Sequence, residues 1–113
     1  CDITITGDTR ISEVRDGQVR TFTVRPSDVG FETAPLDALL IDSAESSAQA
    51  VRAILTGQDK GPCCRHALLN AGAALIVAGL ADDLPAGVAQ AAQAVDSGAA
   101  MSKLEDLVRT SKT

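Results

Sequence analysis

The stretch from Cys63 to His66 carries the side chains best suited to chemistry in this sequence. It follows Pro62, a residue favoured in the first turn of a helix, where the helix dipole and Arg65 are expected to lower the pKa of a thiol. A reactive cysteine or half of a metal site is therefore conceivable. Neighbours on a helix, however, point about 100° apart and do not converge on one ion. Because no second cysteine and histidine cluster completes four ligands, packing is the favoured role of Cys63 and Cys64.

His66 is the only histidine in the sequence. It could act as a general base, but the sequence assigns it no partner carboxylate. A structural or solvated role is favoured, because the context of a site is absent. Ser43, Ser46 and Ser47 open a predicted helix and could offer hydroxyl and N–H groups to a phosphate, although helix capping alone explains them.

The other candidates are pairs of carboxylates. Asp82 and Asp83 precede a predicted helix, while Glu105 and Asp106 lie on the charged side of another, so neither pair is expected to act as an acid and a base. The sequence contains no phosphate-cradling glycine loop, no G-x-S-x-G and no H-E-x-x-H pattern. Taken alone, these residues name no reaction.

Composition limits the classes of protein that the chain can belong to. Aromatic residues make up only 2%, so the core must consist of Ala, Leu, Val and Ile and is thin unless it packs against something else. A net charge of −5 without a basic stripe argues against nucleic-acid binding. No apolar run approaches the roughly 18 residues of a membrane span, and no signal peptide is recognisable.

The three cysteines, Cys1, Cys63 and Cys64, do not form a disulfide framework. The reducing cytoplasm is therefore the expected compartment. Because the chain begins without Met, an upstream segment is expected to have been removed. An N-terminal cysteine that bears a lipid or acts as a processed nucleophile is the less favoured alternative, because one residue specifies almost nothing.

The first third of the chain is predicted to be β structure. Alternating apolar and polar residues occur from Ile3 to Val14, and two runs, 11–15 and 19–24, flank the turn-forming pair Asp16-Gly17. The alternation predicts a hairpin with one apolar face and one charged face.

The rest of the chain is predicted to be helical. A short helical turn follows Pro35, a helix capped by Ser43 runs to Gly57, and a second helix starts at Pro62 and ends near Gly79. Two more helices follow, one capped by Asp82 or Asp83 and broken at Ser97-Gly98, and a final one with Leu104, Leu107 and Val108 on one face. The helix from Pro62 is apolar on nearly every side and is expected to be buried all round, against protein that this chain scarcely supplies.

Several short pieces of the sequence match those of a known enzyme family in their order and spacing. They are Gly61-Pro62, Ala67-Leu68-Leu69-Asn70-Ala71-Gly72-Ala73-Ala74-Leu75, Ala78-Gly79, Gly87-Val88 and Ala94-Val95-Asp96-Ser97-Gly98-Ala99-Ala100, followed by Leu104. Together they are similar to the C-terminal part of anthranilate phosphoribosyltransferases. Ile5-Thr6-Gly7 with Thr9, the Asp16-Gly17 hairpin, Pro26 to Gly30 and the region from Leu36 to Leu55 also resemble that family. The resemblance thus covers essentially the whole chain.

The resemblance implies a reaction and its partners. Enzymes of this family transfer a phosphoribosyl group from phosphoribosyl pyrophosphate to the amine of anthranilate, release pyrophosphate with Mg²⁺ bound, and form homodimers through an N-terminal helical domain. The family's glycine-rich phosphate loop and its Lys-His-Gly-Asn anthranilate motif both lie upstream of the part that this chain resembles. Neither occurs here. The chain is therefore expected to be a fragment, inactive alone, whose partner is the missing N-terminal part.

One position of the family's metal site has a counterpart here. The family carries an acidic Asp-Glu pair that binds Mg²⁺ just before the strand matching Ile3 to Gly7. Asp2 falls on the Glu and is expected to be a carboxylate ligand of Mg²⁺. Cys1 falls on the Asp and is a poor replacement, because a thiolate is soft and Mg²⁺ is hard. Either the metal pair is altered or the alignment slips by one residue; Cys64-Arg65 also replaces the family's frequent Arg-Asp.

The expected fold class is α+β: a small antiparallel β portion with a hairpin, followed by about four helices. It would be part of the larger α/β domain of the phosphoribosyltransferase and nucleoside phosphorylase type. Residues 1–113 would form the C-terminal segment of that domain, with the hairpin region over 1–30 and the helical region over 35–113. Two alternatives remain open: a fragment of a nucleoside phosphorylase-like relative, and a stand-alone module that self-associates through its Ala-rich helices.

Overall fold

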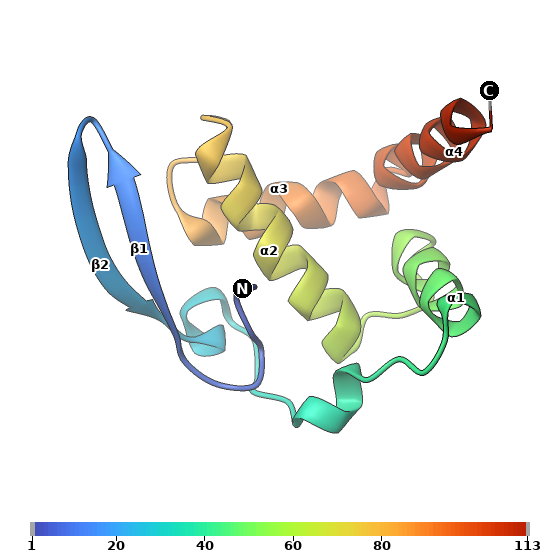
Figure 1. Cartoon of the computed structure of the whole chain (residues 1–113), viewed down its shortest axis with the longest axis horizontal. Helices are drawn as coiled ribbons and strands as arrows, with labels where there is room; N and C mark the ends of the chain where they lie inside the picture. Colours follow the sequence, from blue (N-terminus) through green and yellow to red (C-terminus); the bar gives the residue numbers. More distant parts are fainter. Residues whose placement is uncertain (1, 113) are drawn as a thin grey trace.

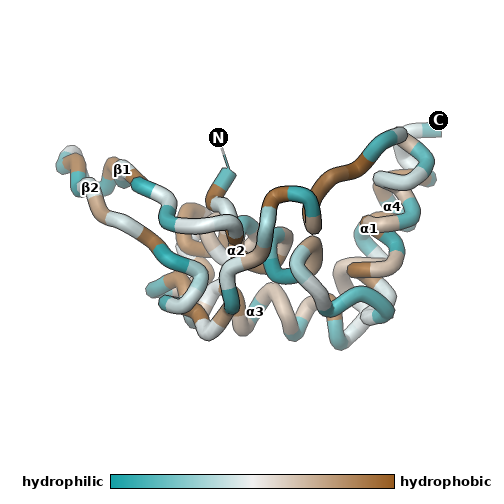
Figure 2. Tube along the Cα trace, turned by 90° about the horizontal axis from the view of Figure 1, so that it is seen from below, coloured by the Kyte–Doolittle hydropathy of each residue, from teal (hydrophilic) through white to brown (hydrophobic). Residues whose placement is uncertain are grey.

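The computed structural model describes residues 2–112, which form one β hairpin and four helices (Figure 1). The expected α+β arrangement is thereby confirmed. Its elements are β1 (Thr9–Arg15), β2 (Gln18–Val24), the short 3-10 turns η1 (Pro26–Val29) and η2 (Leu36–Leu39), α1 (Ala44–Leu55), α2 (Pro62–Val77), α3 (Leu84–Asp96) and α4 (Ala99–Ser111). The hairpin and the pair α1 and α4 lie at opposite ends, with α2 and α3 between them (Figures 1 and 2).

The hairpin forms where the turn signal predicts it. Strands β1 and β2 pair antiparallel from Thr9 opposite Val24 to Arg15 opposite Gln18. Asp16 and Gly17 connect them with φ angles of 53° and 76°, and two consecutive positive φ angles define the turn that matches the twist of a two-residue hairpin.

The two faces of the hairpin are less segregated than expected. Ile11 lies opposite Phe22, but the same face also carries Glu13 opposite Arg20, whose side chains form an ion pair at 3.2 Å. Val14 and Val19 lie opposite each other on the other face and are 74% and 69% exposed. The expectation of one apolar and one charged face was therefore wrong, because strict alternation places Arg20 beside Phe22 and the two valines at the tip of the outer face.

The segment before the hairpin, from Ile3 to Gly7, is not a strand. It was expected to be β, but no described strand pairs with it. Its Ile5 side chain is fully buried, and the Ile5 carbonyl accepts a hydrogen bond from the Ala34 N–H at 3.1 Å. Burial therefore holds the segment in place without a strand ladder.

Local capping signals set the starts of the helices, as the sequence predicts. The Ser43 hydroxyl accepts a hydrogen bond from the Ser46 N–H at 3.0 Å at the start of α1, and the Asp83 carboxylate accepts one from the Ala86 N–H at 2.9 Å at the start of α3. Helix α2 begins at Pro62. Each cap satisfies an N–H group that has no partner within its own helix.

Helices α2 and α3 cross at a pair of glycines. A Cβ atom on Gly87 would lie 2.5 Å from the carbonyl oxygen of Gly72, so neither position has space for a larger residue. The crossing is closed by Leu69, which is fully buried, and by Val88 and Ala91, which are each 7% exposed. This contact forms the centre of the helical part.

Helix α2 is not buried on every side. Its buried residues are Cys64, Leu69 and Gly72, whereas Val77 is 89% exposed. One flank borders an apolar groove of about 610 Å³, which is lined by Ile54, Leu55, Ala67, Leu68, Ala71, Ala74, Leu75, Ala78, Gln90, Ala91, Ala94, Val95 and Ala100. The expected all-round burial is not reached because α1, α3 and η2 cover only part of the apolar surface of α2. None of the helices in the described part of the chain is long and apolar enough to cross a membrane.

Candidate functional site

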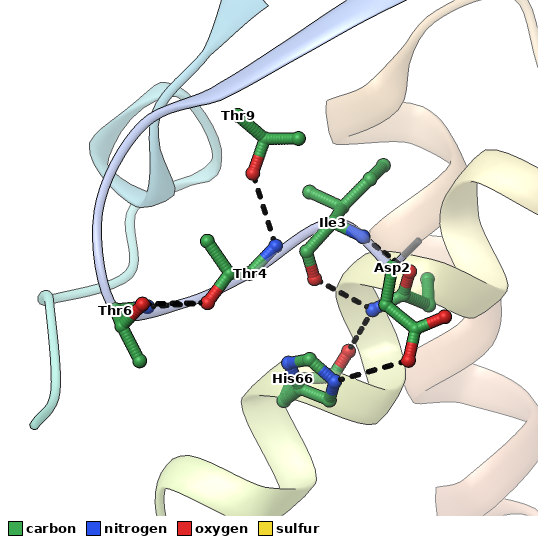
Figure 3. A network of polar contacts seen from close by, with 7 residues as sticks. Asp2, Ile3, Thr4, Thr6, Thr9 and His66 are labelled. Carbon is green, nitrogen blue, oxygen red and sulfur yellow. Dashed lines mark hydrogen bonds and ion pairs between the residues drawn. The ribbon is translucent and has the colours of Figure 1, made fainter. Parts of the chain in front are cut away.

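Asp2, the predicted metal ligand, lies beside the first half of α2. Its Oδ2 atom is 3.9 Å from Nε2 of His66 (Figure 3). The Asp2 side chain is 70% exposed and that of His66 28% exposed. An ion pair between such exposed groups stabilises a fold only weakly, and only when the imidazole is protonated. The structure thus places next to His66 a carboxylate that no sequence pattern could assign to it.

The distance between Asp2 and His66 does not make a catalytic couple. A general base is oriented by hydrogen bonds of about 2.6–3.2 Å, shorter than the 3.9 Å found here. The other ring nitrogen of His66, Nδ1, is buried and has no hydrogen-bond partner among residues 2–112. His66 therefore lies beside the carboxylate at ion-pair distance.

Asn70 holds the backbone next to Asp2. Its Oδ1 atom accepts a hydrogen bond from the Ile3 N–H at 2.9 Å, and its Nδ2 group donates to the Ile3 carbonyl at 2.8 Å. The same Nδ2 group donates to the carbonyl of His66 at 3.0 Å. Sequence reasoning missed this role, since a polar residue inside an apolar helix gives no indication of which distant segment it meets.

Hydrogen bonds among three threonines hold the backbone that follows Ile3 (Figure 3). The Thr4 N–H donates to the Thr9 hydroxyl at 3.0 Å, and the Thr6 N–H donates to the Thr4 hydroxyl at 3.0 Å. The Thr4 and Thr6 hydroxyl oxygens are 2.7 Å apart. Side chains thus replace the missing strand ladder, and the backbone that carries Asp2 is fixed.

The arrangement fits Mg²⁺ as a partial site and not as a closed cage. Mg²⁺ prefers hard oxygen ligands, keeps several waters, and is usually held by one or two carboxylates together with substrate phosphates. Asp2 offers one such carboxylate on a fixed backbone. Within residues 2–112, no group of three or more His, Cys, Asp and Glu side chains could hold an ion by itself. The other expected position, Cys1, lies outside the described residues.

The two adjacent cysteines of α2 have different surroundings. Burial raises the pKa of the Cys64 thiol, and the negative charge of Asp59 adds to the effect, while Lys60 and Arg65 oppose it. The expectation of a lowered thiol pKa at this helix start was therefore wrong for Cys64, because loss of solvation outweighs the nearby cations. The Cys63 thiol lies 3.5 Å from the Ala38 carbonyl. The burial of Cys64 and the contact of Cys63 with the Ala38 carbonyl support packing as the role of these residues.

The remaining polar candidates have structural roles. Ser43 and Ser46 hydrogen-bond to each other at the start of α1, and Asp83 caps α3. Asp106 pairs with Arg109 one turn further along α4. Ser43 and Asp83 therefore cap helices, as the sequence predicts, and Asp106 lies in an ion pair on α4.

Comparison with known proteins identifies the family. The model of the glycosyl transferase family, a/b domain, matches residues 2–101. The anthranilate phosphoribosyltransferase of Rhodopseudomonas palustris (strain HaA2) is 49% identical over 110 residues, which are 97% of this chain and 32% of that protein. The enzyme of the same name from Haloarcula marismortui is 45% identical over 107 residues. The chain spans about a third of the length of these curated relatives.

Solved structures agree with the sequence matches. The crystal structure of anthranilate phosphoribosyltransferase from Thermus thermophilus superposes with a TM-score of 0.85 and 35% identity over 96% of this chain and 32% of that one. The Saccharomyces cerevisiae enzyme in complex with 4-fluoroanthranilate gives a TM-score of 0.83 at 21% identity, which shows the shared fold. The expected resemblance is confirmed along nearly the whole chain, and the protein belongs to the glycosyl transferase family through its α/β domain.

Proposed function

We propose that this chain is the C-terminal segment of the α/β domain of an anthranilate phosphoribosyltransferase. That enzyme transfers a phosphoribosyl group from phosphoribosyl pyrophosphate to the amine of anthranilate, a step of tryptophan biosynthesis. The observation that carries the proposal is 49% identity over 97% of the chain to a relative of that name. Because the chain spans about a third of that relative, the activity is assigned to the complete protein.

Asp2 is the residue of this chain that we assign to the reaction. Its carboxylate would supply one oxygen ligand to Mg²⁺, which when bound neutralises the charge of the departing pyrophosphate. Its exposure and its fixed backbone support this role. Residues 3–6 then serve to hold the carboxylate at one place above α2.

The other parts of the reaction are assigned to the rest of the enzyme. The family's glycine-rich phosphate loop and Lys-His-Gly-Asn motif are not among these 113 residues. Residues 1–113 alone are therefore expected not to catalyse the transfer. The inferred partners are the N-terminal part of the same polypeptide and, through it, a second subunit in a cytoplasmic homodimer.

The test is an assay of the complete gene product with anthranilate, phosphoribosyl pyrophosphate and Mg²⁺. Release of pyrophosphate that requires both substrates and the metal is the expected result. Asp2→Asn is expected to raise the Mg²⁺ concentration needed for half-maximal rate by about tenfold or more, because a neutral amide is a weaker ligand.

The negative control is the 113-residue chain alone, which is expected to release no pyrophosphate. Phosphorolysis of a pyrimidine nucleoside by the complete protein, with no reaction of anthranilate, would instead identify a nucleoside phosphorylase-like relative of the same architecture.

A further inference from the structure

The Asn70 side chain joins α2 to the residue that directly follows Asp2. We propose that Asn70 is a positioning residue: its amide fixes the peptide plane next to Asp2 and so determines where the Asp2 carboxylate is presented. This inference rests on the proposed function, in which Asp2 is a ligand of Mg²⁺.

The hydrogen bonds of Asn70 are all directional and mutually consistent. The Oδ1 atom faces an N–H group, that of Ile3, and the Nδ2 group faces two carbonyl oxygens, those of Ile3 and His66. A flipped amide would place its own N–H groups against the N–H of Ile3 and lose all three bonds. The surroundings therefore allow one orientation of the side chain.

Covalent geometry transmits this orientation to Asp2. The peptide group is planar, so the N–H of Ile3 and the Cα atom of Asp2 lie in one rigid unit. A bond of 2.9 Å from that N–H to Asn70 therefore limits the position of the Asp2 Cα atom. The ψ angle of Asp2, which sets the direction of its Cα–Cβ bond, and the side-chain torsions then determine where the carboxylate oxygens lie.

Asn70 also connects the Ile3 backbone to His66, the residue beside the Asp2 carboxylate. Its bond to the His66 carbonyl ties it to its own helix one turn earlier, and the His66 ring lies 3.9 Å from the Asp2 carboxylate. The backbone beside Asp2 and the His66 ring next to its carboxylate are thus both held by the same turn of α2 (Figure 3).

The experiment is carried out on the complete gene product with Asn70→Ala and Asn70→Asp. The first variant removes all three bonds, and the second keeps the acceptor for Ile3 while it loses both donated bonds. We expect Mg²⁺ to bind about tenfold more weakly to Asn70→Ala, as is usual for partners behind a metal ligand, and the Ile3 amide to exchange faster with deuterium. Calorimetric titration with Mg²⁺ in the presence of phosphoribosyl pyrophosphate measures the affinity.

A matched control separates positioning from stability. Gln90 donates a side-chain hydrogen bond to the Leu80 carbonyl at 2.7 Å, far from Asp2 in the sequence, and Gln90→Ala removes a comparable bond to the backbone. Gln90→Ala is expected to leave the Mg²⁺ affinity unchanged. An Asn70→Ala protein that loses thermal stability but binds Mg²⁺ as the unchanged protein does would overturn the inference.

Asp2→Asn distinguishes failure of this inference from failure of the proposed function. If Asp2→Asn weakens Mg²⁺ binding and neither Asn70 variant does, only the positioning role is wrong. If Asp2→Asn leaves Mg²⁺ binding unchanged, the metal role of Asp2 is wrong and the positioning role falls with it. Where Asn70→Ala does not fold, Asn70→Asp tests the two donated bonds alone, and a Mg²⁺ affinity equal to that of the unchanged protein would overturn their part in the positioning.

Discussion

Cys63 and Cys64 are neighbours in the sequence but differ in their surroundings. The Cys64 side chain is buried, whereas Cys63 is partly accessible and touches the Ala38 carbonyl. At Cys64, burial favours the neutral thiol more than the nearby cations favour the thiolate, so its pKa lies above the ordinary value of 9.0. Position on the helix surface, rather than residue type, sets the chemistry here.

We therefore expect Cys64 to react slowly with a disulfide reagent in mildly alkaline buffer and to react at the usual rate only after unfolding. Above pH 9.0 the unfolded chain loses the thiol proton while the folded protein retains it, so the contribution of Cys64 to the free energy of unfolding falls as the pH rises. Thiol titration of the folded protein measures the rate. Cys64→Ser should remove the slow class of thiol, and a fast reaction of Cys64 in the folded protein would contradict the expectation.

At the scale of the elements, the crossing of α2 and α3 depends on two glycines. Gly in a helix usually costs about 0.5–1 kcal/mol relative to Ala. The approach at Gly72 and Gly87 reverses this preference, because a Cβ on Gly72 would lie 2.8 Å from the Val88 nitrogen and one on Gly87 would lie 2.5 Å from the Gly72 oxygen. Close backbone contact is what these glycines provide.

Gly87→Ala is accordingly expected to lower the free energy of unfolding by up to about 2.5 kcal/mol. Overpacking costs roughly 1–3 kcal/mol, of which the better helix propensity of Ala offsets about 0.5–1 kcal/mol. Urea denaturation measures the change. Gln93→Ala, at an exposed position of the same helix, should change it by less than about 0.5 kcal/mol, and a stabilised Gly87→Ala protein would show that the helices can separate at no cost.

The elements that could be predicted from the sequence are those with local signals. The turn at Asp16-Gly17 and the caps at Ser43 and Asp83 depend on residues within three or four positions, and all of them form. The irregular segment Ile3 to Gly7 and the meeting of Asp2 with His66 and Asn70 could not be predicted. They depend on contacts such as that between Ile3 and Asn70, 67 residues apart, which no short-range pattern encodes.

At the scale of the whole molecule, an apolar surface remains open. The groove along α2 has a volume of about 610 Å³ and is lined by small aliphatic side chains such as Ala71, Ala74 and Leu75. Contiguous apolar surfaces of this kind usually meet another protein surface. For the proposed enzyme, we expect that surface to belong to the remaining part of the polypeptide.

The 113-residue chain by itself is therefore expected to associate without forming one defined oligomer. Sedimentation velocity over a range of concentrations should give an average mass that rises continuously with concentration. Ala71→Glu, which places a charge in the groove, is expected to reduce this association, whereas Ala86→Glu at an exposed position of α3 should not. A single stable oligomer at all concentrations would favour the alternative of a stand-alone interaction module.

The bridge between Ile3 and Asn70 also has a consequence for the order of events during synthesis. The ribosome adds about 5–20 residues per second, so Asn70 is made roughly 3–13 s after Ile3. During that interval the nascent chain holds the residues around Asp2 without the helix that later receives them. A slow codon between the hairpin and α2 would lengthen this interval. Experiments that stall the ribosome at defined chain lengths can show at which length the site is assembled.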